Sequence, residues 1–323
     1  MDKPWLSVIV SSHNRERWLG ATLQSLVDQD DPGIEVVVID GSVNDACLQV
    51  VGNYGDKLNI HAHRRPDLVS RPEKANFGVE QARGEWVCIL DDDDLWLPEK
   101  CAKLREWLAF QSDAVMHLHP CYIIDKSGKR LGLWRCPLPN GQSPVPAPLL
   151  LERLLVQNFI ATPAPMIRRD AYLRVGGLDN RLWYTADWDL YLKIAFLGTV
   201  YYYPYPLACY RVHGSTLTIG GSRDLKDFRS QYQIVVNRHI AKITGTRANE
   251  ILRIAKASID VNTALAGAIR GNFAYIPKAL IALLVLGPRR MQKYFIYSRS
   301  IDRSLPRLRA LITGEFRTVD QER

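Results

Sequence analysis

The residues with the clearest capacity for chemistry are four consecutive aspartates, residues 91–94, which directly follow the apolar run 87–90. Four adjacent negative charges repel one another and raise one another's pKa values unless a cation is present. Carboxylate oxygens on a loop suit Mg²⁺ or Mn²⁺, which proteins hold with one or two carboxylates and substrate phosphates. A helix N-terminus also favours acids, but this accounts for one or two of them rather than four. The run therefore favours a metal site.

A second acidic group, Asp187 and Asp189, opens an amphipathic helical pattern. Acids at the start of a helix more often cap its free backbone N–H groups and so stabilise the helix. The alternative is a general base that accepts a proton from a hydroxyl group. Arg211 and His213 follow later, and their side chains suit either structural hydrogen bonds or a phosphate site. The residues alone leave these alternatives open.

Several common catalytic and binding motifs are absent from the sequence. It contains neither a GxxxxGK[ST] phosphate loop nor a GxGxxG turn after the first apolar run, and it has no GxSxG or HExxH motif. The six cysteines lie singly, without a CxxC pair, which disfavours a zinc or redox site and favours a reducing compartment. A bound nucleotide would therefore be held by something other than a glycine-rich loop.

The first 111 residues alternate between strand and helix patterns. Strands are expected at 6–10, 35–40, 57–63 and 85–90, and helices around Trp18 to Leu26, at 72–83 and at 98–111. This alternation predicts an α/β fold with a mainly parallel, doubly wound sheet. Polar residues follow three of the strands, at 12–14, 40–42 and 91–94. Ligands bind outside the carboxyl ends of such strands, so we expect one crevice there.

The rest of the chain is divided by its pattern and its charge. We expect a hairpin turn at 125–129, a helix at 147–158, a strand at 159–168 and only helices beyond about residue 220. Residues 1–220 carry 23 Lys and Arg against 26 Asp and Glu, whereas residues 221–323 carry 19 against 8. We therefore predict a catalytic domain at 1–220 and a basic helical region at 221–323, with an anionic partner such as lipid or nucleic acid.

The C-terminal region has two interpretations. Its longest apolar run, 279–286, is shorter than the roughly 20 residues that cross a bilayer. Cations follow it, at Arg289, Arg290, Lys293, Arg299, Arg303, Arg307 and Arg309. It is either a packed helical appendage with a solvated basic face or a monotopic attachment to anionic lipid. Without a leader-like N-terminus, the expected location is the cytoplasm, either free or on the inner face of the cell membrane.

Taken together, these segments resemble the inverting family-2 glycosyltransferases of the GT-A fold. The resemblance spans about two thirds of the chain and rests on motifs in the family's order. These are residues 7–15 (SVIVSSHNR), 36–45 (VVVIDGSVND), 74–78 (KANFG), 82–85 (ARGE), 89–96 (ILDDDDLW), 176–179 (GGLD), 187–190 (DWDL) and 210–213 (YRVH). It implies a GT-A fold with a C-terminal helical extension.

The resemblance also implies roles for individual residues. Asp187 becomes the catalytic base. Asp93, the second acid of the DxD motif, becomes the main ligand of Mn²⁺ or Mg²⁺, and His213 completes the metal or diphosphate site. The residues implied in nucleotide binding are Ser12, His13, Asp40, Arg71, Asp91 and Asp92. Among these, Asp91 would lie near the ribose, and Arg71 beside the base. The chain departs from the family pattern at His13, Ile39 and Ala186.

The implied activity is metal-dependent transfer of a sugar, with inversion, from a nucleoside-diphosphate donor to a hydroxyl group. A UDP-sugar is the favoured donor, and a glycan or lipid-linked molecule of cell-surface polysaccharide assembly is the expected acceptor. A sugar nucleotidyltransferase would need a glycine-rich loop at 11–14, where the chain has SSHN. The remaining alternatives are a non-catalytic scaffold of this fold and a basic protein that binds anionic surfaces. The chain has no nucleic-acid-binding motif, so a nucleic-acid partner is not expected.

Overall fold

A central seven-stranded sheet organises the computed structural model, which describes residues 3–111, 113–139, 141, 143–214, 224–243 and 245–312. Its strand order is β10-β6-β9-β4-β1-β2-β3. All neighbours pair in parallel except β9, which is antiparallel to β4 and β6. The strands are β1 (Leu6–Ser12), β2 (Ile34–Asp40), β3 (Ile60–Arg64), β4 (Trp86–Asp91), β6 (Ala114–Leu118), β9 (Met166–Arg168) and β10 (Thr199–Tyr202). The expected mainly parallel sheet is confirmed.

The register of the central strands brings their polar ends together. Every residue of β1 and β2 is buried, as expected for strands covered on both faces. Ser12 pairs with Asp40 on β2, and Ser11 pairs with Asp91 on β4. Three segments that are distant in sequence therefore end at one edge of the sheet, which is where the sequence predicts the crevice.

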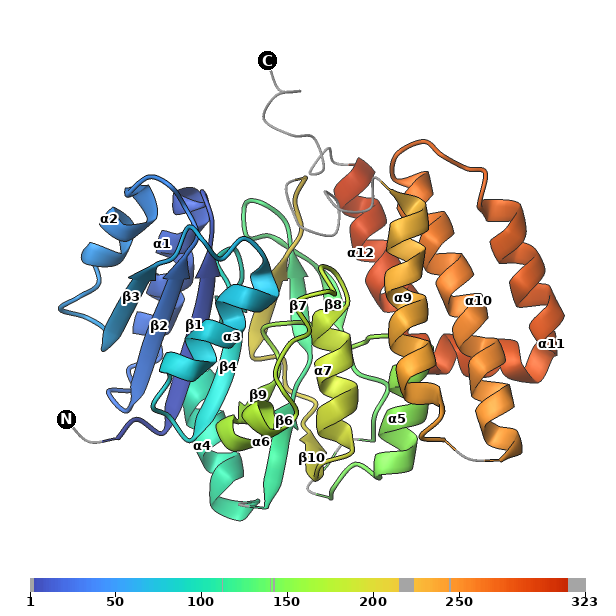
Figure 1. Ribbon diagram of the computed structural model, residues 1–323, viewed down its shortest axis with the longest axis horizontal. Helices are drawn as coiled ribbons and strands as arrows, with labels where there is room; N and C mark the ends of the chain where they lie inside the picture. Colours follow the sequence, from blue (N-terminus) through green and yellow to red (C-terminus); the bar gives the residue numbers. More distant parts are fainter. Residues whose placement is uncertain are drawn as a thin grey trace.

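Helices cover both faces of this sheet. They are α1 (Glu16–Val27), α2 (Ala46–Gly52), α3 (Arg71–Gln81), α4 (Lys100–Phe110), α5 (Ala147–Val156), α6 (Arg169–Arg174) and α7 (Ala186–Ala195). Helix α3 packs on β1 and β2 in front of the sheet in the view of Figure 1. Gly78 permits this approach, because a Cβ atom there would lie 2.3 Å from Cγ2 of Ile9. The close packing fixes the N-terminus of α3, and with it Arg71, near the strand ends.

A smaller sheet lies beside the first and has the order β5-β11-β7-β8. Its strands are β5 (Leu95–Trp96), β7 (Cys121–Ile124), β8 (Arg130–Trp134) and β11 (Ala208–Arg211). The predicted turn at 125–129 connects β7 and β8, with Oδ1 of Asp125 accepting from the backbone N–H groups of Ser127 and Lys129. The predicted strand at 159–168 is wrong for residues 159–165, since only β9 forms. Pro163 and Pro165 lack the N–H donors that a strand ladder needs.

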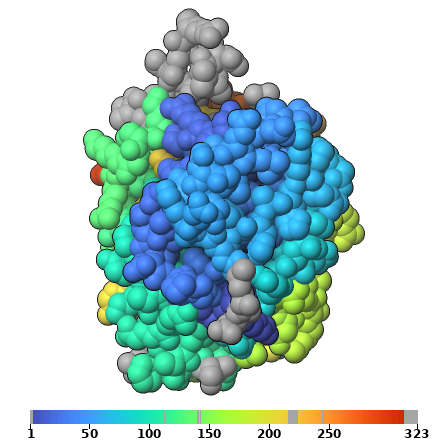
Figure 2. Space-filling view, turned by 90° about the vertical axis from the view of Figure 1, so that its left-hand side faces the viewer, coloured from blue at the N-terminus to red at the C-terminus, as the bar shows by residue number. Residues whose placement is uncertain are grey.

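The C-terminal helices pack against the rest of the molecule. They are α9 (Leu225–Ile240), α10 (Thr246–Ala268), α11 (Ile276–Ser298) and α12 (Ser300–Ile312). Helix α10 contacts α5, α9 and α11, and α12 lies against β8 (Figure 1). The opposite end of the molecule is formed mainly by the first half of the chain (Figure 2). The predicted boundary at residue 220 lies outside the described residues, and among the described helices none is long and apolar enough to cross a membrane.

Candidate active site

A cavity of about 670 Å³ lies between the carboxyl ends of β1 and β4 and the C-terminal helices. Its size is typical of a site for a small-molecule ligand. Seven of the nine residues expected at the site line it: Ser12, His13, Arg71, Asp91, Asp92, Asp93 and Asp187. Asp40 is fully buried behind the lining, where its Oδ1 accepts from Oγ of Ser42 at 2.6 Å. His213 is also buried and contacts the site through Asp93.

The end of β1 contributes the rim of the cavity. Nδ1 of His13 lies 3.0 Å from the carbonyl oxygen of Gly41, and the next residue, Asn14, has a positive φ of 51° that turns the chain sharply. Nζ of Lys74 donates to the carbonyl oxygen of Ser12 at 3.3 Å. Lys74 therefore places a buried positive charge behind the rim. Lys74 belongs to the KANFG motif, but the sequence resemblance implied no role for it.

The four aspartates of residues 91–94 do not act as one cluster. Oδ1 of Asp91 accepts from Nε of Arg71 at 2.6 Å. Asp92 and Asp93 both accept from Nη1 of Arg15, at 3.2 and 2.7 Å. Asp94 is turned to the backbone N–H of Arg211, at 2.8 Å, and does not line the cavity. The mutual repulsion predicted for the run is thus only partly relieved, because Asp91 and Asp94 have partners of their own whereas Asp92 and Asp93 share Arg15.

The pKa values of Asp92, Asp93 and Asp94 reflect the different surroundings of these carboxyl groups. Burial and the neighbouring charge of Asp93 raise the pKa of Asp92, and the same two effects raise that of Asp94. Burial also acts to raise the pKa of Asp93, but the hydrogen bond from His213 and the charge of Arg15 outweigh it and the pKa is lowered. Asp93 is therefore the member of the run best held as a carboxylate.

Asp93 and His213 together fit a divalent cation. Nε2 of His213 lies 2.9 Å from Oδ2 of Asp93, and the ring of Trp18 stacks on His213 at 5.4 Å. No group of three His, Cys, Asp or Glu side chains suited to a metal occurs within the part of the chain that the structure describes. Mn²⁺ and Mg²⁺ accept such sparse protein ligation where substrate phosphates supply further oxygens. Arg15 shares the same carboxylate oxygen and would border the ion.

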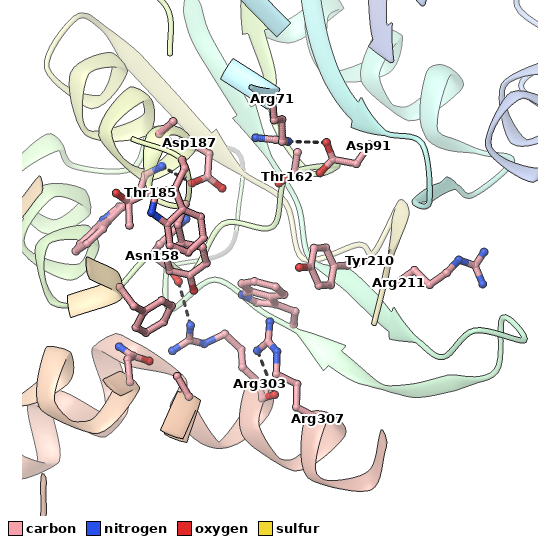
Figure 3. Close-up of a pocket in the computed structure, with 18 of the residues that line it drawn as sticks. Arg71, Asp91, Asn158, Thr162, Thr185, Asp187, Tyr210, Arg211, Arg303 and Arg307 are labelled. Atoms are coloured by element: carbon pink, nitrogen blue, oxygen red, sulfur yellow. Dashed lines mark hydrogen bonds and ion pairs between the residues drawn. The ribbon is translucent and has the colours of Figure 1, made fainter. Parts of the chain in front are cut away.

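Asp187 lines the same cavity, at the N-terminus of α7. Figure 3 shows Arg71 between Asp91 and Asp187. Burial raises the pKa of Asp187 to about 6, although the charge of Arg71 and hydrogen bonds from the Trp188 backbone and Asn158 oppose the rise. A carboxyl group with a pKa near neutrality is suited to exchange protons as a general base.

Asp189 has a different role from Asp187, although the two share a helix turn. It is fully buried, and its Oδ1 lies 2.8 Å both from Nη1 of Arg238 and from Nε2 of His239 on α9. Nζ of Lys193 lies 3.2 Å from Oδ2 of the same carboxylate. This buried network ties α7 to α9 and so positions Asp187. Sequence reasoning missed His239 because it lies 50 residues further along the chain.

We expect Asp189→Asn to lower the free energy of unfolding by about 2 kcal/mol, because it removes the buried carboxylate whose ionised form these hydrogen bonds and charges stabilise. Burial opposes ionisation of Asp189, but its hydrogen bond from His239 and the nearby cations lower its pKa to about 2. The stabilisation is therefore present above about pH 4 and lost as the pH falls toward 2. Urea unfolding measures the change. Asp187→Asn is the matched control and should cost little, because burial already disfavours that charge; equal losses in both variants would contradict this assignment.

The far half of the cavity is lined by aromatic residues and by two arginines. The aromatic residues are Trp134, Trp183, Tyr184, Tyr210, Phe228 and Tyr232. Arg303 and Arg307 of α12 also line it, and only 8% of Arg303 is exposed. The expectation that Arg303 belongs to a solvated or lipid-facing basic surface is therefore wrong, because its face of α12 packs over β8 and the cavity. Arg211 also lines the cavity, and its Nε and Nη1 donate to backbone carbonyl groups.

Comparisons with known proteins agree with this architecture. Residues 7–176 match the model of glycosyl transferase family 2. An uncharacterized glycosyltransferase of Haemophilus influenzae is 28% identical over 58% of this chain and 61% of its own length, so the chain spans about three fifths of that relative. The structure of Staphylococcus aureus TarS 1-349 in complex with UDP-GlcNAc matches 96% of this chain and 92% of its own, with a TM-score of 0.65 and 18% identity. A mannosyltransferase from Pyrobaculum calidifontis, PcManGT, in complex with GDP-Man and Mn²⁺, matches 98% of this chain and 86% of its own, with a TM-score of 0.53 and 18% identity. These matches confirm the GT-A fold, and the first structure also covers the helical C-terminal part.

Proposed function

The chain belongs to glycosyl transferase family 2, and we propose that it transfers a sugar, with inversion, from a nucleoside-diphosphate donor to a hydroxyl group of an acceptor. One observation carries the proposal: Asp187, with a pKa of about 6, shares a cavity with Arg71, Asp91 and Asp93 at the strand ends. A base on one side and a group of residues suited to diphosphate on the other are the two parts that such a transfer needs.

The donor half of the cavity is the part bordered by β1, β4 and α3. Ser12 and His13 would contact the nucleoside, with Asp40 supporting them from behind, and Arg71, Asp91 and Asp92 would surround the ribose and diphosphate. Arg15 and Lys74 add positive charge beside the same carboxylates. The complexes of TarS with UDP-GlcNAc and of PcManGT with GDP-Man support a nucleotide sugar as the ligand. We favour a UDP-sugar.

Asp93 and His213 would hold Mn²⁺ or Mg²⁺. When bound, the cation neutralises the diphosphate and makes it a better leaving group. The remaining chemistry falls to side chains of the protein. Arg71, which donates to Asp91, keeps a second guanidinium nitrogen, Nη2, without a partner among the described residues and offers it to the diphosphate.

Asp187 would take the proton of the acceptor hydroxyl as its oxygen attacks the anomeric carbon. The new carbon–oxygen bond forms on the face opposite the breaking bond to the diphosphate, so the configuration inverts in one displacement. The electron pair leaves with the nucleoside diphosphate, and the proton stays on Asp187. The base must be ionised, so the rate should fall as the pH decreases below about 6.

The proposal is tested by the release of nucleoside diphosphate. The full chain is incubated with Mn²⁺ and, separately, with UDP-glucose, UDP-GlcNAc, GDP-mannose and dTDP-glucose, and the slow hydrolysis of each donor is followed. We expect one nucleotide class to be consumed well above the others and the loss of this activity in Asp187→Asn. Absence of turnover with every donor would favour the scaffold alternative.

We also propose that the protein attaches to an anionic membrane through α11. Four large apolar side chains on its first half are 56–78% exposed: Leu280, Ile281, Leu284 and Val285. The helix kinks at Gly287, and exposed Arg289 follows. An apolar helix face bordered by cations suits insertion beside anionic headgroups. A lipid-linked acceptor would be delivered from the same surface.

We expect the protein to co-sediment with vesicles that contain anionic lipid and not with neutral vesicles. Leu284→Asp should weaken this binding about tenfold or more, because it removes apolar burial worth about 2 kcal/mol. Phe110→Asp is the control, since Phe110 is 83% exposed on α4. Equal sedimentation with both vesicle types, or equal loss in both variants, would contradict the attachment.

A further inference from the structure

Two arginines of α12 extend into the cavity, and the described residues offer them no acidic partner. Arg303 is 8% exposed, its Nη1 donates to the backbone oxygen of Asn158 at 3.2 Å, and its Nε has no acceptor in the described part of the chain. Nη1 of Arg307, one turn later, donates to the backbone oxygen of Arg303 at 3.3 Å. Among the residues that the structure describes, no carboxylate forms an ion pair with either guanidinium group.

This arrangement does not stabilise the fold. Removing a cation from water without a counter-charge costs free energy, and like charges four residues apart on a helix repel each other. Burial, together with the charge of Arg307, lowers the pKa of Arg303 to about 10. Arg71, by contrast, has Asp91 beside it, and Arg15 has Asp92 and Asp93. The pair on α12 is therefore suited to bind an anion.

A third donor lies beside the two arginines. Trp134 of β8 is 8% exposed, and its Nε1 has no acceptor among the described residues. Its ring centroid lies 5.1 Å from Cζ of Arg307 and 5.8 Å from Cζ of Arg303. Trp134, Arg303 and Arg307 thus form one wall of the cavity, and each can donate an N–H hydrogen bond to a ligand.

The position of the wall separates it from the donor half of the cavity. Asn158 accepts from Arg303 with its backbone oxygen, and its side chain hydrogen-bonds to Asp187. Figure 3 shows Arg303 and Arg307 on one side of Asp187 and Arg71 with Asp91 on the other. An anion at the arginines would therefore lie on the side from which the acceptor approaches the base.

We propose that Arg303 and Arg307 bind a phosphate group of the acceptor, next to the hydroxyl that Asp187 deprotonates. The inference rests on the proposed function, since it names the acceptor class. A guanidinium group can donate two parallel hydrogen bonds to phosphate, and two such groups can surround a phosphomonoester or diester. Phosphate could come from a lipid-linked acceptor or from a polyol phosphate. Leu265, Ile269, Phe273, Leu308 and Leu311 line the same end of the cavity and would contact a lipid chain.

The test measures phosphate binding with the donor half already filled. Calorimetry follows farnesyl phosphate, uncharged farnesol and glycerol 3-phosphate titrated into the full chain saturated with UDP and Mn²⁺. Arg303→Gln and Arg307→Gln are compared with wild type and with Arg253→Gln, which removes an exposed arginine of α10 that does not line the cavity. We expect at least one phosphate probe to bind wild type and the control equally, and each cavity variant about tenfold or more weakly, with melting temperatures unchanged or higher.

The three probes distinguish the source of the phosphate. Much tighter binding of farnesyl phosphate than of glycerol 3-phosphate identifies a lipid-linked acceptor, and equal binding identifies a polyol phosphate. Phosphate affinity that is unchanged in both cavity variants, or no phosphate binding to wild type, would overturn the inference. If UDP fails to bind wild type, the proposed donor is wrong, yet a dependence of phosphate binding on Arg303 remains measurable. The two failures are therefore distinguishable.

Discussion

Asp187→Asn is expected to reduce sugar transfer by about 10²–10⁴-fold while leaving the affinity for nucleoside diphosphate unchanged. Asparagine keeps the shape of the side chain and can still accept from the backbone N–H of Trp188, but it cannot take a proton. The turnover number and the dissociation constant of UDP, measured on the same preparation, separate the two effects. Asp170→Asn, which removes an exposed acid outside the cavity, is the control for the charge change.

The pH dependence gives the same prediction an independent readout. Because burial raises the pKa of Asp187 to about 6, the wild-type rate should fall about tenfold per pH unit well below that value. The residual rate of Asp187→Asn should lack this dependence between pH 5 and 7. Wild-type turnover in the variant, or an unchanged pH profile, would exclude Asp187 as the base.

Asp93→Asn is expected to weaken the Mn²⁺-dependent binding of the donor by about 100-fold or more. Loss of a single group that only orients a metal ligand already costs 10–100-fold, and Asp93 would be a ligand itself. The variant also removes the acceptor charge shared by Arg15 and His213. The Mn²⁺ concentration that gives half-maximal donor hydrolysis measures the effect, and the electron paramagnetic resonance signal of free Mn²⁺ checks it without turnover.

Asp94→Asn is the matched control for this prediction. Asp94 is the next residue in the same acidic run, but it faces the backbone of Arg211 and burial raises its pKa. Asparagine can keep that hydrogen bond through its side-chain oxygen. The Mn²⁺ requirement should therefore stay close to that of wild type. If Asp93→Asn and Asp94→Asn shift the requirement equally, the metal assignment is wrong.

The convergence of residues at the strand ends could be predicted because its determinants are local. Short apolar runs indicate buried strands. Parallel pairing then brings the polar residues at the ends of these strands to one edge of the sheet, as it does for Ser12, Asp40 and Asp91. The roles within the run 91–94 were not predictable from spacing. They depend on where Arg15, Arg71 and Arg211 arrive from other elements.

The half of the cavity lined by aromatic residues and α12 was less predictable because its residues meet only through packing. Arg303 was expected on a basic surface of the C-terminal region. The packing of α12 against β8 buries it instead. Asp189 and His239 form one network although the pattern around Asp189 indicated only a helix start. The strand expected at 159–168 followed from apolar content, whereas the two prolines limited it to β9.

The most direct test of the account is calorimetric titration of UDP, GDP and dTDP into the wild-type chain, each with and without Mn²⁺. In the proposed function, the donor diphosphate would lie between Arg71 and the Asp93–His213 pair. We therefore expect one of the three nucleotides to bind tightly, and only when Mn²⁺ is present. Binding of none of them under either condition would contradict the assignment of this cavity to a nucleotide sugar.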